Sequence, residues 1–242
     1  MTNIAYRHLV AAGVMVLAFV HIGTGIVMED PFFAVIGVVG LVIAAVAARF
    51  DHWWALVPSM VAGIALLLQI TFFIDMLGRV DTVEFAYGWA CIIAGVPVVV
   101  FGVADLIARR RHVSRTAPAI VSRFAAAAAM AVVAVVVTSG VATITGRDTV
   151  SAEDRTGAIQ VTYKDTEVEQ KEISAKAGVP VRIVVENKDV WYHNFEVVGT
   201  SVKVDLGAKE SKIVELNLAP GEYTYHCTVP GHGSMTGTLT IE

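Results

Sequence analysis

Charged residues and cysteines are scarce in this 242-residue chain. Only 17% of the residues are charged and 55% are hydrophobic, whereas about a quarter of an ordinary soluble domain is charged. The net charge is −4 and no basic run is long enough to follow a phosphate backbone, so we expect no nucleic-acid partner. The two cysteines, Cys91 and Cys227, are too few for a disulfide framework.

Lysine is missing from the first part of the chain, since all seven lysines lie beyond residue 147. Residues 1–146 hold eight arginines against seven acidic residues. Residues 147–242 hold ten basic residues against fifteen acidic ones, which leaves a net charge of −5. Such a step in composition indicates a domain boundary. We therefore predict a membrane region at residues 1–146 and a water-soluble module at residues 147–242.

The first part contains long apolar stretches, each close to the ~20 residues that a helix needs to cross about 30 Å of hydrocarbon. Charged residues or proline separate these stretches. The alternative is that they are core helices of a soluble protein. No small-residue cleavage site follows the first stretch, which argues against a cleaved signal peptide. We predict an all-α bundle of about five transmembrane helices, at residues 6–28, 32–48, 53–74, 85–107 and 124–144.

Arginine is distributed unevenly between the two sets of loops. One set holds only Arg79 among five acidic residues, and the other set holds seven arginines. Because cytoplasmic loops carry an excess of basic residues, we predict a multi-pass protein of the plasma membrane bilayer with a cytoplasmic amino terminus. Five crossings then place the module after about residue 146 outside the cytoplasm. The cytoplasmic set is Arg7, Arg49, Arg109, Arg110, Arg111, Arg115 and Arg123.

Three polar residues interrupt the predicted spans, and such residues are functional hypotheses by default. Asp105 precedes Arg109 by four residues, which favours an ion pair at the membrane interface. The other two are His21 and Gln69. His21 and the acidic loops from Glu29 and Asp75 could gather a metal ion, but we favour the alternative that these are solvated loop charges. No well-buried pair of histidines falls at one membrane depth, so we propose no haem, and the sequence assigns no activity to the helices.

Beyond residue 157 the hydrophobic period changes to two, which is typical of β-strands. Turn signals such as Ala219-Pro220-Gly221 separate the alternating runs. We predict an all-β Greek-key sandwich or barrel of about seven or eight short strands. The alternating runs lie at residues 159–163, 181–185, 214–218, 223–225 and 237–241.

The last strand-and-loop segment gathers side chains that bind soft metals. Cys227 is followed five residues later by His232, and Met235 comes three residues after that. A thiolate, two imidazoles and a weak axial methionine form the ligand set of a blue-copper electron-transfer site. His193 is the candidate for the second imidazole. It shares strand parity with the apolar Phe195, so we expect it to face the core.

On these residues, the module at 150–242 resembles a cupredoxin, the small blue-copper fold of plastocyanin and azurin. The run from Cys227 to His232 is similar to azurin, although only Gly233 and Ser234 separate His232 from the methionine, fewer residues than in azurin-like loops. The resemblance implies one type 1 copper ion held by a trigonal set and an axial contact. By this resemblance the trigonal set is His193, Cys227 and His232, and the axial contact is Met235.

The resemblance also implies a supporting pair outside the ligand set. In the family, an asparagine after the first ligand histidine ties its loop to the residue that follows the cysteine. In this chain these residues are Asn194 and Thr228. His226 resembles the histidine that binds a second, catalytic copper in copper nitrite reductases, but alternation along the strand points it away from Cys227.

We therefore predict a membrane-anchored blue copper protein that transfers single electrons at the outer face of the plasma membrane, and an electron carrier rather than an enzyme. Its partners would be redox proteins, and the net charge of −5 on the module favours a basic docking face. Two alternatives remain open. One is an exported copper-binding or copper-delivery protein, and the other is a subunit of a copper enzyme such as nitrite reductase.

Overall fold

The computed structural model of the chain describes residues 4–72 and 74–242, which divide into two compact units. The first unit contains the chain up to Val80 together with Glu84–Gly140. The second unit contains Asp81–Val83 and Val141–Glu242. A domain boundary between residues 146 and 147 stays a prediction.

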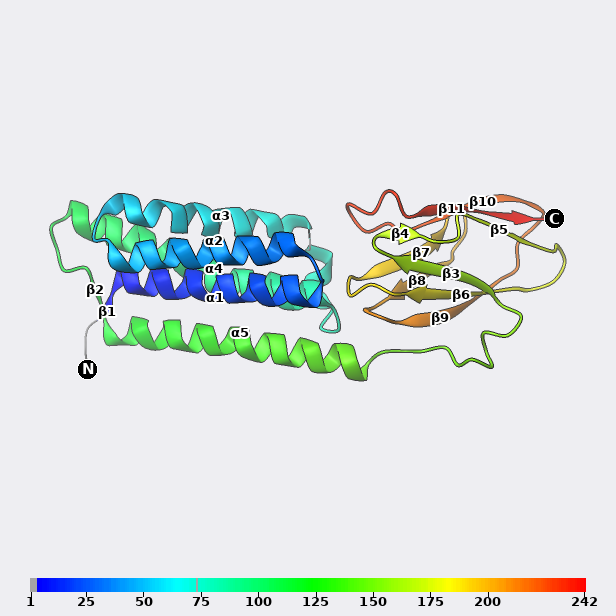
Figure 1. Cartoon of the computed structure of the whole chain (residues 1–242), viewed down its shortest axis with the longest axis horizontal. Helices are drawn as coiled ribbons and strands as arrows, with labels where there is room; N and C mark the ends of the chain where they lie inside the picture. Colours follow the sequence, from blue (N-terminus) through cyan, green and yellow to red (C-terminus); the bar gives the residue numbers. More distant parts are fainter. Residues whose placement is uncertain (1–3, 73) are drawn as a thin grey trace. The chain divides into compact units, whose positions relative to one another are not determined.

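The first unit is built from long apolar helices (Figure 1). In the described residues, five helices are long and apolar enough to cross a membrane, which confirms the predicted number. Asp30 is the N-cap of the second helix, because its side chain accepts a hydrogen bond from the Phe32 amide at 2.8 Å. Pro31 follows it at the first helical position, which proline favours. The helices are α1 (Tyr6–Val27), α2 (Pro31–Arg49), α3 (Val57–Gln69), α4 (Val83–Arg110) and α5 (Ala119–Thr145).

The third predicted span, at residues 53–74, differs from one uninterrupted α-helix. The 3-10 turns η1 (Trp53–Leu56) and η2 (Ile70–Phe72) flank α3, and residue 73 lies outside the described residues. A proline in the first turn of α3 explains the change at its start, because proline lacks the amide hydrogen that a helix interior needs. Trp53–Phe72 still provides 20 residues, enough for about 30 Å of hydrocarbon. A further 3-10 turn, η3 (Ile74–Gly78), follows.

The outer surfaces of these helices are apolar. Large side chains such as Phe19, Phe32 and Met130 are at least 60% exposed, and only Val132 and Ser139 of α5 are buried. Soluble monomers rarely expose contiguous apolar patches of this kind. The alternative of core helices in a soluble protein would require the same side chains to be covered by protein.

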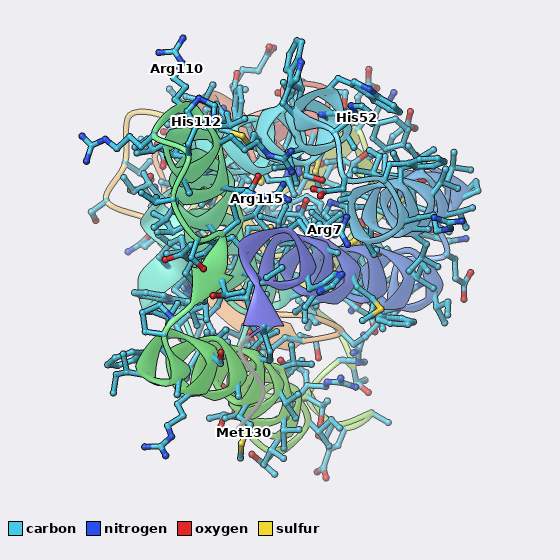
Figure 2. The ribbon with its side chains drawn as sticks, turned by 90° about the vertical axis from the view of Figure 1, so that its left-hand side faces the viewer. Arg7, His52, Arg110, His112, Arg115 and Met130 are labelled. Atoms are coloured by element: carbon cyan, nitrogen blue, oxygen red, sulfur yellow. The ribbon has the colours of Figure 1, made fainter. Side chains whose placement is uncertain are left out.

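Arginines gather at one end of the helical unit, where the two-residue strands β1 (Ile4–Ala5) and β2 (Thr116–Ala117) pair. Figure 2 looks onto this end, with Arg7, Arg110 and Arg115 around it. The Asp51 carboxylate forms salt bridges with Arg109 at 2.7 Å and with Arg115 at 2.5 Å. The hydrogen bond from Arg115, which outweighs slight burial, holds the Asp51 pKa well below its usual range. The predicted ion pair between Asp105 and Arg109 is confirmed.

The second unit is a sandwich of two sheets with the strand orders β5-β11-β10-β7-β8 and β4-β3-β6-β9. Two strand pairs, β3 with β6 and β5 with β11, are parallel, and the other pairs are antiparallel. The described residues of this unit form nine strands rather than the seven or eight expected. They are β3 (Ile159–Lys164), β4 (Glu167–Val168), β5 (Glu172–Ala175), β6 (Val181–Asn187), β7 (His193–Val197), β8 (Lys203–Leu206), β9 (Ser211–Leu216), β10 (Gly221–His226) and β11 (Thr236–Ile241).

The core of the sandwich comes from the alternating runs that the sequence predicted. Val161 and Ile183 belong to one sheet, Phe195 and Leu239 belong to the other, and all four side chains are fully buried. The three shortest strands are not among the predicted runs, because two to four residues are too few to establish a period of two. The long strands therefore define the core, and their ends carry the site described next.

Candidate metal centre

Three metal-binding side chains converge at one end of the sandwich. His193 is the first residue of β7, Cys227 follows the last residue of β10, and His232 lies in the loop between β10 and β11. The Nδ1 atoms of the two histidines are 3.1 Å apart, and the Cys227 Sγ is 3.6 Å from His232 Nδ1 and 3.9 Å from His193 Nδ1. All three donor atoms lie within 4.8 Å of one another.

These distances suit a shared metal ion. Nitrogen and sulfur donors at about 2.0–2.3 Å from one transition-metal ion stand roughly 3–4 Å apart. One thiolate and two imidazoles are soft and intermediate donors, which favour copper over the hard cations calcium and magnesium. The chemistry and the spacing of the donors therefore fit the copper ion that the sequence implied.

The protonation of the two imidazoles also fits metal binding. The Nε2 atom of His193 is 2.9 Å from the Asp189 carboxylate, and a carboxylate accepts hydrogen bonds, so Nε2 carries the proton and Nδ1 keeps a lone pair. Burial lowers the pKa of His232 to about 4, which leaves this imidazole neutral near pH 7. Burial raises the pKa of the Cys227 thiol, and metal binding would have to displace its proton.

Asp189 joins His193 to a neighbouring turn. Its carboxylate accepts hydrogen bonds from the amides of Asp165 at 2.8 Å and Thr166 at 3.1 Å. Both turn residues have positive φ, as a two-residue hairpin turn of this hand requires. Burial alone would raise the Asp189 pKa, but the hydrogen bonds from His193 and the two amides outweigh it and lower the pKa to about 2. Asp189 is thus an anion that fixes the ring of His193.

Asn194 and Thr228 form a reciprocal pair beside the donors. The Asn194 side-chain amide donates to the Thr228 hydroxyl at 2.8 Å, and the Thr228 backbone amide donates to Asn194 Oδ1 at 2.8 Å. The Asn194 backbone amide also lies 3.5 Å from the Cys227 sulfur. The structure brings together the two residues that the family resemblance singled out, and their bonds tie the end of β7 to the cysteine loop.

Met235 closes the loop from the other side. It is fully buried, its amide donates to the His232 carbonyl at 2.9 Å, and its carbonyl accepts from the Cys227 amide at 2.9 Å. These backbone bonds hold Met235 in the same loop as the three donors. Its assignment as the axial ligand stays a prediction.

His226 lies outside this cluster. Its neighbours Tyr225 and Cys227 are buried, while its own ring is partly exposed and lies 3.8 Å from a carboxylate oxygen of Glu196. This is the opposite side of the strand, as alternation predicted. Among the residues that the structure describes, one group of three metal-binding side chains lies close enough to share an ion, namely His193, Cys227 and His232.

Asp189 was not predicted from the sequence, although it precedes His193 by only four residues. An aspartate next to Asn187 and Lys188 is typical of a surface turn, and only the fold places it against His193. Asn187 holds this turn, because its side-chain amide donates to the carbonyls of Trp191 and Gly207 at 2.7 Å each. A short polar loop thus becomes a rigid support for the candidate ligand.

Replacing Asp189 by asparagine tests this support. Asparagine offers one acceptor oxygen where aspartate offers two, so at least one of the three hydrogen bonds is lost and the His193 ring is less constrained. We expect the Asp189→Asn variant to bind copper about 10–100-fold more weakly, measured by competition with a chelator, and to show an altered paramagnetic resonance spectrum. Asp165→Asn is the matched control, because that side chain is 84% exposed. An affinity and a spectrum equal to wild type in Asp189→Asn would contradict the role.

Comparison with known proteins gives one family and several similar folds. A family model described as a cupredoxin-like domain matches residues 123–241. The comparison with curated proteins finds no match.

Three solved structures illustrate the similarity. A dithionite-reduced auracyanin from the photosynthetic bacterium Roseiflexus castenholzii is 20% identical in sequence and has a TM-score of 0.32. The match covers 35% of this chain and 96% of the auracyanin chain. Auracyanin A, a blue copper protein from Chloroflexus aurantiacus, is 21% identical, with 35% and 98% coverage and a TM-score of 0.32. The Cu(I) form of an amicyanin variant is 26% identical, with 40% and 92% coverage and a TM-score of 0.32.

Proposed function

The chain carries a cupredoxin-like domain over residues 123–241, and from this premise we propose that it is a membrane-anchored carrier of single electrons. The family match supports a copper electron-transfer role. In this proposal His193, Cys227 and His232 hold one type 1 copper ion, Met235 makes the axial contact, and Asn194 and Thr228 keep the two ligand segments together.

The observation that carries the proposal is the convergence of three donors from separate segments. His193 is 34 positions before Cys227 in the sequence, yet their donor atoms are 3.9 Å apart. A bound copper ion supplies one-electron chemistry at this point. The chain's own residues limit rearrangement, because Asp189 fixes His193 and the Asn194–Thr228 pair fixes the cysteine loop.

The candidate ligands differ in their exposure to solvent. His193, Cys227 and Met235 are buried, which keeps water away from the metal position. His232 is half-buried, and its loop neighbours Gly231 and Gly233 are exposed. The His232 edge is thus the part of the donor set nearest to solvent, and we place the docking of redox partners there. The net charge of −5 on residues 147–242 favours a partner with a basic face.

The helices define the proposed location. The arginines at one end of the helical unit favour a cytoplasmic position for that end, and an odd number of crossings then exports the copper domain. The carrier would work at the outer face of the plasma membrane, between a membrane redox complex and an oxidase or reductase.

The test is a redox titration of the full-length protein loaded with Cu(II) in detergent. An electron carrier shows an intense visible thiolate-to-copper band that bleaches on reduction and returns on oxidation, while the copper content stays constant. Release of copper on reduction would instead indicate a copper-delivery protein. A second, nearly colourless copper in the paramagnetic resonance spectrum, lost in His226→Ala, would indicate an enzyme subunit.

A further inference from the structure

Three polar side chains are linked by hydrogen bonds inside the helical unit, and none of them is a candidate copper ligand. His21 of α1 is buried, its Nδ1 lies 2.8 Å from the Leu17 carbonyl, and its Nε2 lies 2.9 Å from the Tyr87 hydroxyl of α4. A carbonyl only accepts, so Nδ1 of the neutral ring carries the proton and Nε2 accepts the proton of Tyr87. The Tyr87 hydroxyl is also 3.3 Å from the side-chain amide oxygen, Oε1, of Gln69 in α3.

This arrangement leaves hydrogen-bonding capacity on Gln69. The contact with Tyr87 occupies at most one lone pair of the Gln69 amide oxygen, Oε1. The amide has two N–H groups and an oxygen with two lone pairs, so both donors and at least one lone pair remain. Among the described residues, the Gln69 side chain makes one hydrogen bond, which is the contact with Tyr87.

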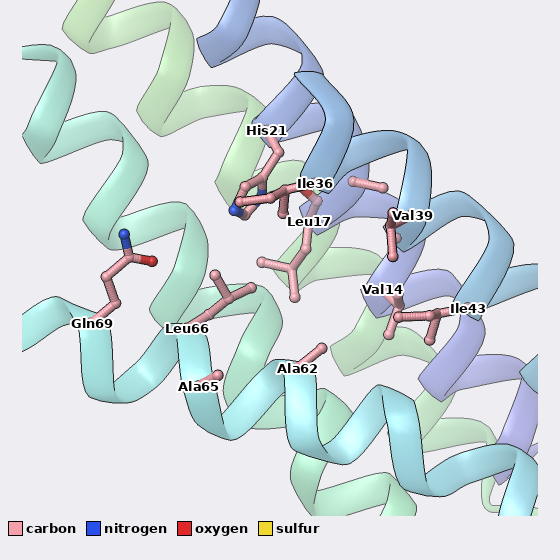
Figure 3. Close-up of a pocket in the computed structure, with 12 residues that line it drawn as sticks. Val14, Leu17, His21, Ile36, Val39, Ile43, Ala62, Ala65, Leu66 and Gln69 are labelled. Atoms are coloured by element: carbon pink, nitrogen blue, oxygen red, sulfur yellow. The ribbon is translucent and has the colours of Figure 1, made fainter. Parts of the chain in front are cut away.

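A cavity of about 320 Å³ opens at this polar group. Figure 3 shows His21 and Gln69 at one end of it and aliphatic side chains along the rest. The volume lies at the lower end of the ~300–1,000 Å³ range of small-molecule sites. From His21 to Val14 the cavity follows seven residues of α1, about 10 Å at the rise of a helix. Its apolar lining includes Val14, Leu17, Ile36, Val39, Ile43 and Leu66.

The position of the polar end suits an amphipathic molecule from the bilayer. His21 lies near the end of α1, which finishes at Val27, and Gln69 is the last residue of α3. The polar end is therefore close to the helix ends opposite the arginines, whereas the apolar part extends toward the middle of the helices. A ligand with a polar ring and an apolar tail would match both parts, with its ring near the membrane surface.

We propose that this cavity binds the ring of a lipid-soluble quinone or quinol, with Gln69 as its hydrogen-bond partner. An amide serves both redox forms, because its N–H donates to a quinone carbonyl and its oxygen accepts from a quinol hydroxyl. The alternative occupant, a lipid acyl chain, has no group that bonds with Gln69 and would leave the N–H groups of this half-buried amide unpaired. The site needs no copper, because every residue that lines the cavity belongs to the helical unit.

The test is binding of decylubiquinone to the full-length protein in phosphatidylcholine nanodiscs. We expect about one bound molecule per chain, with its carbonyl stretching band shifted to lower frequency by the hydrogen bond. Decylbenzene, which has the same chain and no carbonyl, is the matched competitor and should compete poorly. Equal competition by decylbenzene, an unshifted carbonyl band, or no binding would each overturn the proposal.

Two pairs of variants locate the site. Gln69→Leu should weaken binding about tenfold, or ~1.4 kcal/mol, and abolish the band shift, whereas Thr71→Val in the neighbouring exposed turn should not. Ala62→Phe fills the cavity and should prevent binding, whereas Ala126→Phe on the exposed side of α5 should not. Wild-type affinity in both Gln69→Leu and Ala62→Phe would place the quinone elsewhere.

The copper proposal and the quinone proposal can fail separately. The Cys227→Ser variant removes the candidate thiolate ligand but leaves every residue of the cavity in place. It should bind decylubiquinone with wild-type affinity whether or not the wild-type protein proves to be blue. Loss of quinone binding in this variant would show that the cavity is not an independent site.

Discussion

The Cys227→Ser variant, loaded with Cu(II), is expected to lose the intense visible band completely. The band requires a thiolate bound to Cu(II), and the hydroxyl of serine is a harder and weaker donor for copper. Loss of a supporting residue outside the ligand set costs about 10–100-fold in metal affinity, so loss of the thiolate itself should cost more. The measurements are the absorption spectrum of the copper-loaded full-length protein and the copper content after dialysis against a chelator.

The chain supplies its own control in its other cysteine. Cys91 lies in α4, is fully buried, and belongs to the core of the helical unit. Cys91→Ser should therefore keep the colour and the copper of the wild type. A coloured Cys227→Ser protein, or a colourless Cys91→Ser protein that still contains its helices by circular dichroism, would contradict the ligand assignment.

The donor residues were visible in the sequence because copper selects unusual side chains. A cysteine without a disulfide partner, followed by His232 and Met235 at short spacing, is rare enough to indicate a metal loop. His193 was found because strand parity aims it at the core beside Phe195, and both side chains are fully buried. Local patterns thus located the residues that the fold brings together.

The supporting residues were less accessible to sequence analysis. Asp189 acquires its role because a turn about two dozen residues earlier and the ring of His193 meet at its carboxylate. Asp51 similarly receives arginines from segments about 60 residues further along the chain. Such roles depend on long-range packing, whereas periodicity and spacing report only on neighbours in the sequence.

The helical unit illustrates the same division. Hydropathy predicted five spans, and the structure has five helices that satisfy the length and composition of a span within its described residues. The hydrogen-bonded side chains of His21, Tyr87 and Gln69 come from three different helices. Nothing in the sequence relates position 21 to position 87. The membrane spans could be predicted one at a time, but their shared interior could not.

The second large effect is expected at Gly237 in β11, directly opposite Tyr225 in β10. A Cβ atom at Gly237 would lie 2.4 Å from the Tyr225 ring and 2.9 Å from the Lys171 carbonyl. Tyr225 is fully buried, packs on Phe195 with ring centroids 5.4 Å apart, and donates its hydroxyl proton to the Gln170 carbonyl. The ring therefore has no free space to move into.

We expect Gly237→Val to lower the free energy of unfolding of the β-sandwich by about 3 kcal/mol or more. Overpacking of a core costs about 1–3 kcal/mol, and displacing Tyr225 adds the loss of a hydrogen bond worth about 1 kcal/mol. Tyr225 precedes Cys227 by two residues, so copper binding should weaken together with stability. The measurement is urea unfolding followed by the visible band, with circular dichroism as a second probe.

Gly233 provides the matched control, because no atom beyond its two neighbours in the chain lies within 4 Å of the Cβ that an alanine would add there. Gly233→Ala should change the free energy of unfolding by less than about 0.5 kcal/mol. A double variant identifies the cause, since Tyr225→Ala removes the ring that the valine would strike. If the clash is responsible, Gly237→Val must cost clearly less in the Tyr225→Ala background than in the wild type. Equal costs in the two backgrounds would mean that the tyrosine ring does not set the requirement for glycine.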